Sequence, residues 1–158
     1  MPKYEDSYVG RIRKLIGKEK IIVVATRAII RDHVGRVLFV QRTDNSKWVM
    51  PSGALELDET LFEGMQREVK EETGLDVVAA TPMAIYSYPS SITAYGDPYY
   101  QISVQFLVEE WSGTLLTETD ETTQARFFDI DEPPEGVADY YQEVLNDLRK
   151  FDGRFILK

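Results

Sequence analysis

GALELDETLFEGMQREVKEETGL occupies residues 53–75 and predicts the helix around which the remaining elements are arranged. Thr60 followed by Glu63 forms a capping-box pattern, although Asp58 is an alternative N-cap. Gly74 is a natural stop, because glycine accepts the left-handed conformation at a helix C-terminus. Seven of the 23 residues are acidic, and they crowd toward the end of the stretch. We therefore expect an acidic helix that begins after Thr60 and ends before Gly74.

A helical wheel divides this segment into three faces. The apolar face holds Leu61, Phe62, Met65 and Val69; the acidic strip holds Glu68, Glu71 and Glu72; the third face holds Glu63, Arg67 and Lys70. Carboxylates on one strip repel each other, and carboxylate oxygens are ligands for divalent cations. A solvated acidic face with ion pairs is the alternative, but it leaves the separation of the cations from the strip unexplained. Gly64, one turn before Glu68, would leave room for a ligand.

Composition limits the other possibilities. The 158 residues are enough for one domain, residues 1–158, with a sizeable core. The net charge of −9 disfavours nucleic acid and anionic membranes as partners. The chain has no cysteine and a single histidine, His33, which excludes thiolate sites and sites built on several histidines. No signal peptide or membrane-spanning run is visible, so a cytoplasmic protein is expected.

The rest of the chain predicts strands with a helix at each end. We expect helices at 4–17 and 138–151, a hairpin of strands at 20–32 and 37–42, and further strands at 75–88, 99–111 and 125–130. Strands that alternate with substantial helices predict an α/β fold, in which a mixed sheet packs between helices. Arg27 falls inside the first strand, where a charge needs a reason.

The central stretch resembles the sequence motif of the Nudix hydrolase family, which includes MutT-like proteins. The fixed positions of that motif are Gly53, Glu59, Arg67, Glu68, Glu71, Glu72 and Gly74, with apolar residues at Val69 and Leu75. The resemblance extends to Gln41-Arg42, Trp48 and Pro51 before the motif, and to residues 125–132 after it. The helix at 4–17 is similar to the subgroup of ADP-ribose-pyrophosphatase-like enzymes. Ser52 and Asp58 depart from the glycines of many members, which affects the local turn more than metal binding.

This resemblance implies a fold, a reaction and a metal. The fold is an α/β/α sandwich with a mixed sheet. The reaction is hydrolysis of a nucleoside diphosphate linked to another moiety, as in ADP-ribose, a sugar nucleotide or a nucleoside triphosphate. Family similarity implies Mg²⁺ or Mn²⁺ held by Glu68 and Glu72, with Glu71 as a further ligand or a proton acceptor. The backbone carbonyl of Ser52 is another ligand, and Arg67 forms an ion pair with Glu59.

Other candidates lie outside the motif. Glu121, in the acidic loop TETDETTQ, is the predicted general base, with Glu118 and Asp120 as competitors. Arg42 is placed to reach a phosphate, or else to form a surface ion pair.

Aromatic residues are the candidates for contact with the rest of the substrate. Trp48 either stacks on a base or caps the core edge. Tyr86 and Tyr95, in a segment that also holds Tyr88 and Tyr99, either stack on a nucleobase or sugar or serve packing. The alternative function is a nucleotide-binding or regulatory module without turnover. Homodimers are common in the family, and the first helix is a candidate interface.

Overall fold

A computed structural model describes residues 4–137 and 139–158 of the chain. Its elements are η1 (Tyr4–Asp6), α1 (Tyr8–Ile16), β1 (Ile21–Ile29), β2 (Val37–Arg42), β3 (Trp48–Val49), β4 (Ser52–Ala54), α2 (Leu61–Thr73), β5 (Asp76–Ile92), β6 (Pro98–Ser112), β7 (Thr122–Phe128), α3 (Asp139–Lys150) and β8 (Ile156–Leu157). None of the described helices is both long and apolar enough to span a membrane.

The strands form two sheets. The larger sheet has the order β4-β1-β6-β5-β8, and the smaller one has the order β3-β2-β7. Within the larger sheet, β1 runs parallel to β6 and antiparallel to β4, while β5 and β6 form a long antiparallel hairpin. The predicted combination of a mixed sheet with helices is therefore confirmed.

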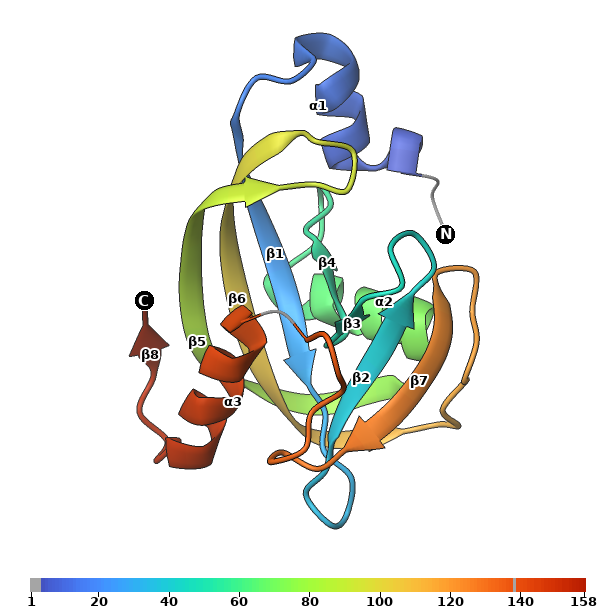
Figure 1. Ribbon diagram of the computed structural model, residues 1–158, viewed down its shortest axis with the longest axis vertical. Coiled ribbons are helices and arrows are strands. Elements are labelled where there is room, and N and C mark those ends of the chain that lie inside the picture. Colours follow the sequence, from blue (N-terminus) through green and yellow to red (C-terminus); the bar gives the residue numbers. More distant parts are fainter. Residues whose placement is uncertain (1–3, 138) are drawn as a thin grey trace.

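Helices lie on both faces of the larger sheet (Figure 1). On one face, the ring of Phe62 in α2 packs edge-on against Phe106 of β6, with centroids 6.3 Å apart. On the other face, the Arg27 side chain of β1 lies over the ring of Tyr141 in α3, at 4.7 Å. Residues 105 and 106 point to opposite faces because side chains alternate along a strand. This alternation places Gln105 beside Arg27, under α3.

The predicted hairpin of β1 and β2 is wrong. The chain turns back after β1 with a bridge between Arg31 and Val37 and with backbone bonds from Asp32 N to Arg36 O at 3.0 Å and from Leu38 N to Ile30 O at 2.9 Å. The two strands then separate into different sheets. Both strands are apolar along most of their length, as is typical of strands buried on two faces. Such runs indicate burial but do not identify the partner strand.

The predicted ends of α2 are confirmed. The Thr60 hydroxyl accepts a hydrogen bond from the Glu63 amide, and the Glu63 carboxylate accepts one from the Thr60 amide. Gly74 ends the helix in the left-handed conformation, with φ of 75°. Met65 and Val69 are almost fully buried, so the apolar face of the wheel is the face that docks the helix.

Elsewhere the predicted boundaries shift. The helix expected at 4–17 is divided into η1 and α1, because Ser7 caps α1 by accepting a bond from the Gly10 amide. Residue 138, where the last helix was expected to begin, lies outside the described residues, and α3 is described from Asp139. Strand β7 begins at Thr122, three residues before the expected start. The end of the chain adds β8 to the larger sheet, beside β5.

Candidate active site

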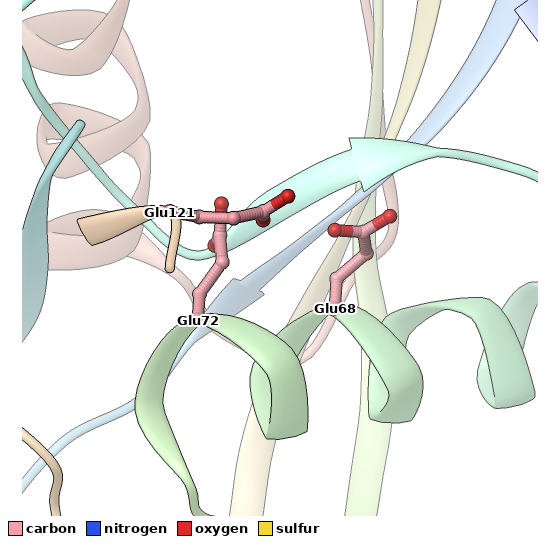
Figure 2. A group of neighbouring side chains, drawn as sticks. All are labelled: Glu68, Glu72 and Glu121. Carbon is pink, nitrogen blue, oxygen red and sulfur yellow. The ribbon is translucent and has the colours of Figure 1, made fainter. Parts of the chain in front are cut away.

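Three carboxylates from two parts of the chain meet beside β4. Glu68 and Glu72 project from α2, and Glu121 reaches them from the turn before β7 (Figure 2). One oxygen from each lies within 4.8 Å of the other two. Glu68 and Glu72 lie one helical turn apart on one face of α2, so the helix itself aligns them.

Hydrogen bonds hold this group in place from three sides. The Ser52 amide of β4 donates to the Glu72 carboxylate at 3.0 Å. The Thr122 hydroxyl donates to the backbone carbonyl of Glu72 at 3.1 Å, which ties the start of β7 to the end of α2. The backbone carbonyl of Glu121 accepts a bond from the Thr43 amide at 2.9 Å. The turn that carries Glu121 is therefore anchored to both α2 and the end of β2.

Gly53 makes room for the carboxylate of Glu68. A Cβ atom at Gly53 would lie 2.1 Å from the Glu68 carboxylate carbon, which no real contact allows. The glycine of β4 is thus a spatial requirement of the acidic group. Gly64 has a different role from the one predicted, because its open side is filled by Glu59 and Leu55, 2.8 Å and 2.9 Å from an added Cβ, instead of a ligand.

Arg67 connects the acidic strip to the loop before α2. Its guanidinium forms a two-pronged ion pair with Glu59, at 2.8 and 2.9 Å. Its Nη1 also donates to Glu68 at 2.6 Å and to Glu71 at 3.2 Å. The predicted separation of the cations from the acidic strip is therefore wrong. The long arginine side chain bends across the helix surface, and the wheel gives only the direction of Cβ.

Glu68 and Glu72 are buried, Glu121 is half-buried, and the three carboxylates have few positive charges beside them. Burial raises the pKa of Glu68 to about 7, although Arg67 opposes the rise. Glu72 is 1% exposed, and burial together with Glu68 raises its pKa well above the usual value. Among the described residues, its one cationic neighbour within 4.0 Å is Arg42, at that distance. Burial also raises the pKa of Glu121, an effect that Arg42 opposes. Buried carboxylates in this number need a further cation to stay ionised, and their oxygens fit a divalent cation of the Mg²⁺ type.

The structure places the other predicted groups around this cluster. Glu71 is held by Arg67 at the edge of the group and is not one of the three clustered carboxylates. Ser52 lies next to Glu72 through its amide, while a ligand role for its carbonyl stays a prediction. Arg42 forms a two-pronged pair with Asp44 at 2.9 and 3.0 Å and still faces Glu72.

The three predicted aromatic residues have different surroundings. Trp48 packs edge-on against Phe128, with centroids 5.1 Å apart, which agrees with the alternative role of covering the core edge. Tyr86 is 1% exposed, and its hydroxyl donates to Asp147 of α3. Tyr95 lies exposed at the tip of the β5–β6 hairpin, against Tyr4. Contact of these residues with a substrate stays a prediction.

A cavity of about 390 Å³ lies between the β5–β6 pair and the start of α3. Tyr88, Tyr99 and Tyr140 contribute their rings to its lining, and Arg27 lies directly behind it. Sequence reasoning did not assign this site. The available signal was Arg27, a charge inside an apolar strand.

Comparisons with known proteins agree with this geometry. Residues 22–148 match the family model described as the NUDIX domain. A MutT-like protein of Streptomyces ambofaciens is 30% identical over 142 residues, which are 85% of this chain and 86% of that protein. An ADP-ribose pyrophosphatase of Methanocaldococcus jannaschii is 29% identical over 120 residues, 73% of this chain and 67% of the relative. The crystal structure of a MutT NUDIX hydrolase from Burkholderia pseudomallei is similar in fold, with a TM-score of 0.67 at 22% identity, over 79% of this chain and 96% of that one.

Proposed function

Because the chain belongs to the NUDIX domain family and is a Nudix hydrolase, we propose that it cleaves a nucleoside diphosphate linked to another moiety, in a reaction that requires Mg²⁺ or Mn²⁺. The observation that carries this proposal is the buried group of Glu68, Glu72 and Glu121. A diphosphate is anionic, and so is this protein, at a net charge of −9. The two repel each other unless cations are bound between them.

In this proposal Glu68 and Glu72 hold the cation, with the Ser52 carbonyl as a further ligand. When bound there, a divalent cation would supply charge to neutralise phosphate oxygens and would lower the pKa of a water molecule that attacks phosphorus. Residues of β4 set the positions of these two carboxylates. Gly53 leaves the space for Glu68, and the Ser52 amide fixes one oxygen of Glu72.

Glu121 is the proposed proton acceptor. No lysine or arginine of the described part of the chain lies within 4.0 Å of its carboxylate. Glu71, the other candidate, accepts a hydrogen bond from Arg67 at 3.2 Å, so its carboxylate is already engaged. Glu71 then serves the site by holding Arg67 against the helix, or as an additional ligand.

The rest of the substrate lies beyond the carboxylates. Arg42 faces Glu72 and is the proposed contact for a phosphate. ADP-ribose, sugar nucleotides and nucleoside triphosphates are the substrate types to test; the ADP-ribose pyrophosphatase relative favours the first. We propose that residues 1–158 act as one domain, while the cytoplasmic location and the homodimer stay predictions.

Two substitutions test the assignment. Glu72→Gln should lower turnover by about 10³-fold or more, because a lost ligand removes water activation, and should weaken Mn²⁺ binding. Glu121→Gln should lower turnover about 10²-fold with Mn²⁺ affinity nearly unchanged. Glu63→Gln on the same helix is the matched control, since glutamine also completes a capping box.

The measurements are phosphate release over the substrate panel and Mn²⁺ titration followed by electron paramagnetic resonance. Near-normal turnover by Glu72→Gln would refute the metal assignment. A loss of Mn²⁺ affinity in Glu121→Gln would make Glu121 a ligand instead of the base. Tight nucleotide binding without turnover on any panel member would indicate the binding module instead of the enzyme.

A further inference from the structure

The cavity under α3 is rich in hydrogen-bond donors and lacks acidic groups. Its lining consists of Ser87, Tyr88, Pro89, Ser90, Ser91, Tyr99, Gln101 and Tyr140. The polar side chains among these are hydroxyls and one amide. The chain has 27 acidic residues against 18 lysines and arginines. A cavity whose described lining holds no carboxylate therefore differs from the rest of this acidic protein. Its volume of about 390 Å³ suits a small organic group.

Arg27 lies behind this cavity with an uncompensated charge. The residue is 3% exposed, and its guanidinium lies over the rings of Tyr140 and Tyr141 at 5.2 and 4.7 Å. Its Nη1 makes one long bond, of 3.4 Å, to the Gln105 side chain, and its Nε has no partner. Within residues 4–137 and 139–158, no aspartate or glutamate lies within 4.0 Å of it. Burying such a charge without a counter-ion is costly.

Tyr88 is a second residue with an unpaired buried polar atom, and it belongs to the lining of the cavity. Its ring lines the cavity, and its hydroxyl is buried without a hydrogen-bond partner. Arg27 is close enough to oppose the rise that burial causes in the pKa of Tyr88. The carboxylates of α3 near this wall, Glu143 and Asp147, are bound by Lys158 at 3.0 and 2.7 Å. They are therefore engaged elsewhere and do not neutralise Arg27.

A strand pair connects the residue behind this cavity to the acidic group. Arg27 of β1 lies opposite Ser52 of β4, and the Ser52 amide donates a hydrogen bond to the Glu72 carboxylate at 3.0 Å. Arg42 faces the same carboxylate at 4.0 Å. Arg27 is therefore one strand away from the residue that fixes Glu72.

We propose that the pocket lined by Tyr88, Tyr99 and Tyr140, with Arg27 behind it, binds an oxyanion, a phosphate monoester or a carboxylate, carried by one of the two moieties that flank the diphosphate. The substrate role of this pocket rests on the function proposed above. The positive charge of Arg27 favours an anion in the cavity beside it, because a buried charge is only weakly screened. The hydroxyl side chains of the lining are donors for such an oxyanion, and the tyrosine rings suit the sugar or base that carries the group.

The test uses pairs of diphosphates that differ only by such a group: UDP-glucuronate against UDP-glucose, coenzyme A against its dephospho form, and NADP⁺ against NAD⁺. We expect the wild-type protein to favour the oxyanion member of at least one pair by tenfold or more in kcat/KM, mainly through KM. Arg27→Met should bring the two members of that pair to equal kcat/KM, and Arg27→Lys should restore part of the preference. Tyr88→Phe, which removes only a hydroxyl, should reduce the preference and is the variant to use if Arg27→Met fails to fold.

Equal kcat/KM within all three pairs overturns the proposal, as does a preference that survives both Arg27→Met and Tyr88→Phe. An equal loss for both members in Arg27→Met also overturns it, because Arg27 then recognises a part that all nucleotides share.

Binding without turnover separates this proposal from the proposed function. In the Glu72→Gln protein without metal, inorganic phosphate should shift the Arg27 Nε–H signal in NMR spectra, and the shift should be weaker in Tyr88→Phe. A shift in this variant, combined with no turnover of any substrate by the wild-type protein in the presence of Mg²⁺ or Mn²⁺, would leave the oxyanion pocket standing and refute the hydrolase assignment to this site. The absence of a shift would refute the pocket.

Discussion

Replacing Gly53 by alanine tests whether the backbone of β4 sets the position of the Glu68 carboxylate. The added Cβ would lie 2.1 Å from the carboxylate carbon and from one oxygen, and 2.4 Å from the other oxygen. Ordinary contact begins near 3.4 Å, so the carboxylate has to retreat by more than 1 Å. The three nearest atoms all belong to the end of one flexible side chain. The strand can therefore keep its place while Glu68 gives way.

The expected result is a large loss of activity in a folded protein. A misplacement of about 1 Å in a catalytic group costs about 10²-fold in rate, which corresponds to about 2.7 kcal/mol of transition-state stabilisation. The free energy of unfolding should change by no more than about 1 kcal/mol, since alanine is the better strand residue and the clash falls on a side chain end. Phosphate release gives the first quantity, and urea denaturation gives the second.

A double-mutant cycle with Glu68→Ala shows whether the effect passes through Glu68. Once the glutamate side chain is gone, the three atoms nearest to the new methyl group are gone as well. Adding Gly53→Ala to Glu68→Ala should then cause no further loss of kcat/KM, so that the coupling energy equals the whole effect of Gly53→Ala. Additive losses would refute the reasoning, and so would a Gly53→Ala protein with wild-type turnover.

Two further predictions concern ion pairs outside the carboxylate group. Arg67→Lys should lower the free energy of unfolding by about 1–2 kcal/mol and kcat by about tenfold or more, because a lysine cannot make the two-pronged contact with Glu59; wild-type values in urea denaturation and in turnover would contradict this. Burial alone would raise the pKa of Asp147, but hydrogen bonds from Lys158 and Tyr86 lower it overall. The contribution of Asp147 to the free energy of unfolding is therefore present above the ordinary pKa of about 4, and it is lost as the pH falls through the lower folded pKa. Asp147→Asn should therefore cost about 1–2 kcal/mol at pH 7 and progressively less below about pH 4 in denaturation curves, and a cost that is constant with pH would contradict the ion pair.

The ends of α2 were predictable because they depend on residues that are neighbours in the sequence. Strand pairing was not, because it depends on residues that are far apart in the sequence. The capping box at Thr60 and the stop at Gly74 act within a few residues, and both are present in the structure. The partner of β1 depends on which distant strand fits beside it, and an apolar run does not encode that choice. Tyr86 and Tyr88 lie on the same side of β5 by alternation, yet one is covered by α3 and the other lines the cavity. The position of α3 decides between them, and it is set by packing far along the chain.

A bound cation would explain why the folded protein keeps carboxylates that repel one another. Glu72 is almost fully buried beside Glu68, and both are ionised only at a cost. Anything that binds the native state and not the unfolded chain stabilises the native state in proportion to the logarithm of its concentration. A divalent cation held by these carboxylates, as proposed above, would therefore offset this cost. Removing one charge by Glu72→Gln should, on the same argument, stabilise the cation-free protein while it removes the gain in thermal stability on adding Mg²⁺. The proposed function would then account for carboxylates that lower the stability of the cation-free protein, since functional sites are where sequences commonly depart from the most stable choice.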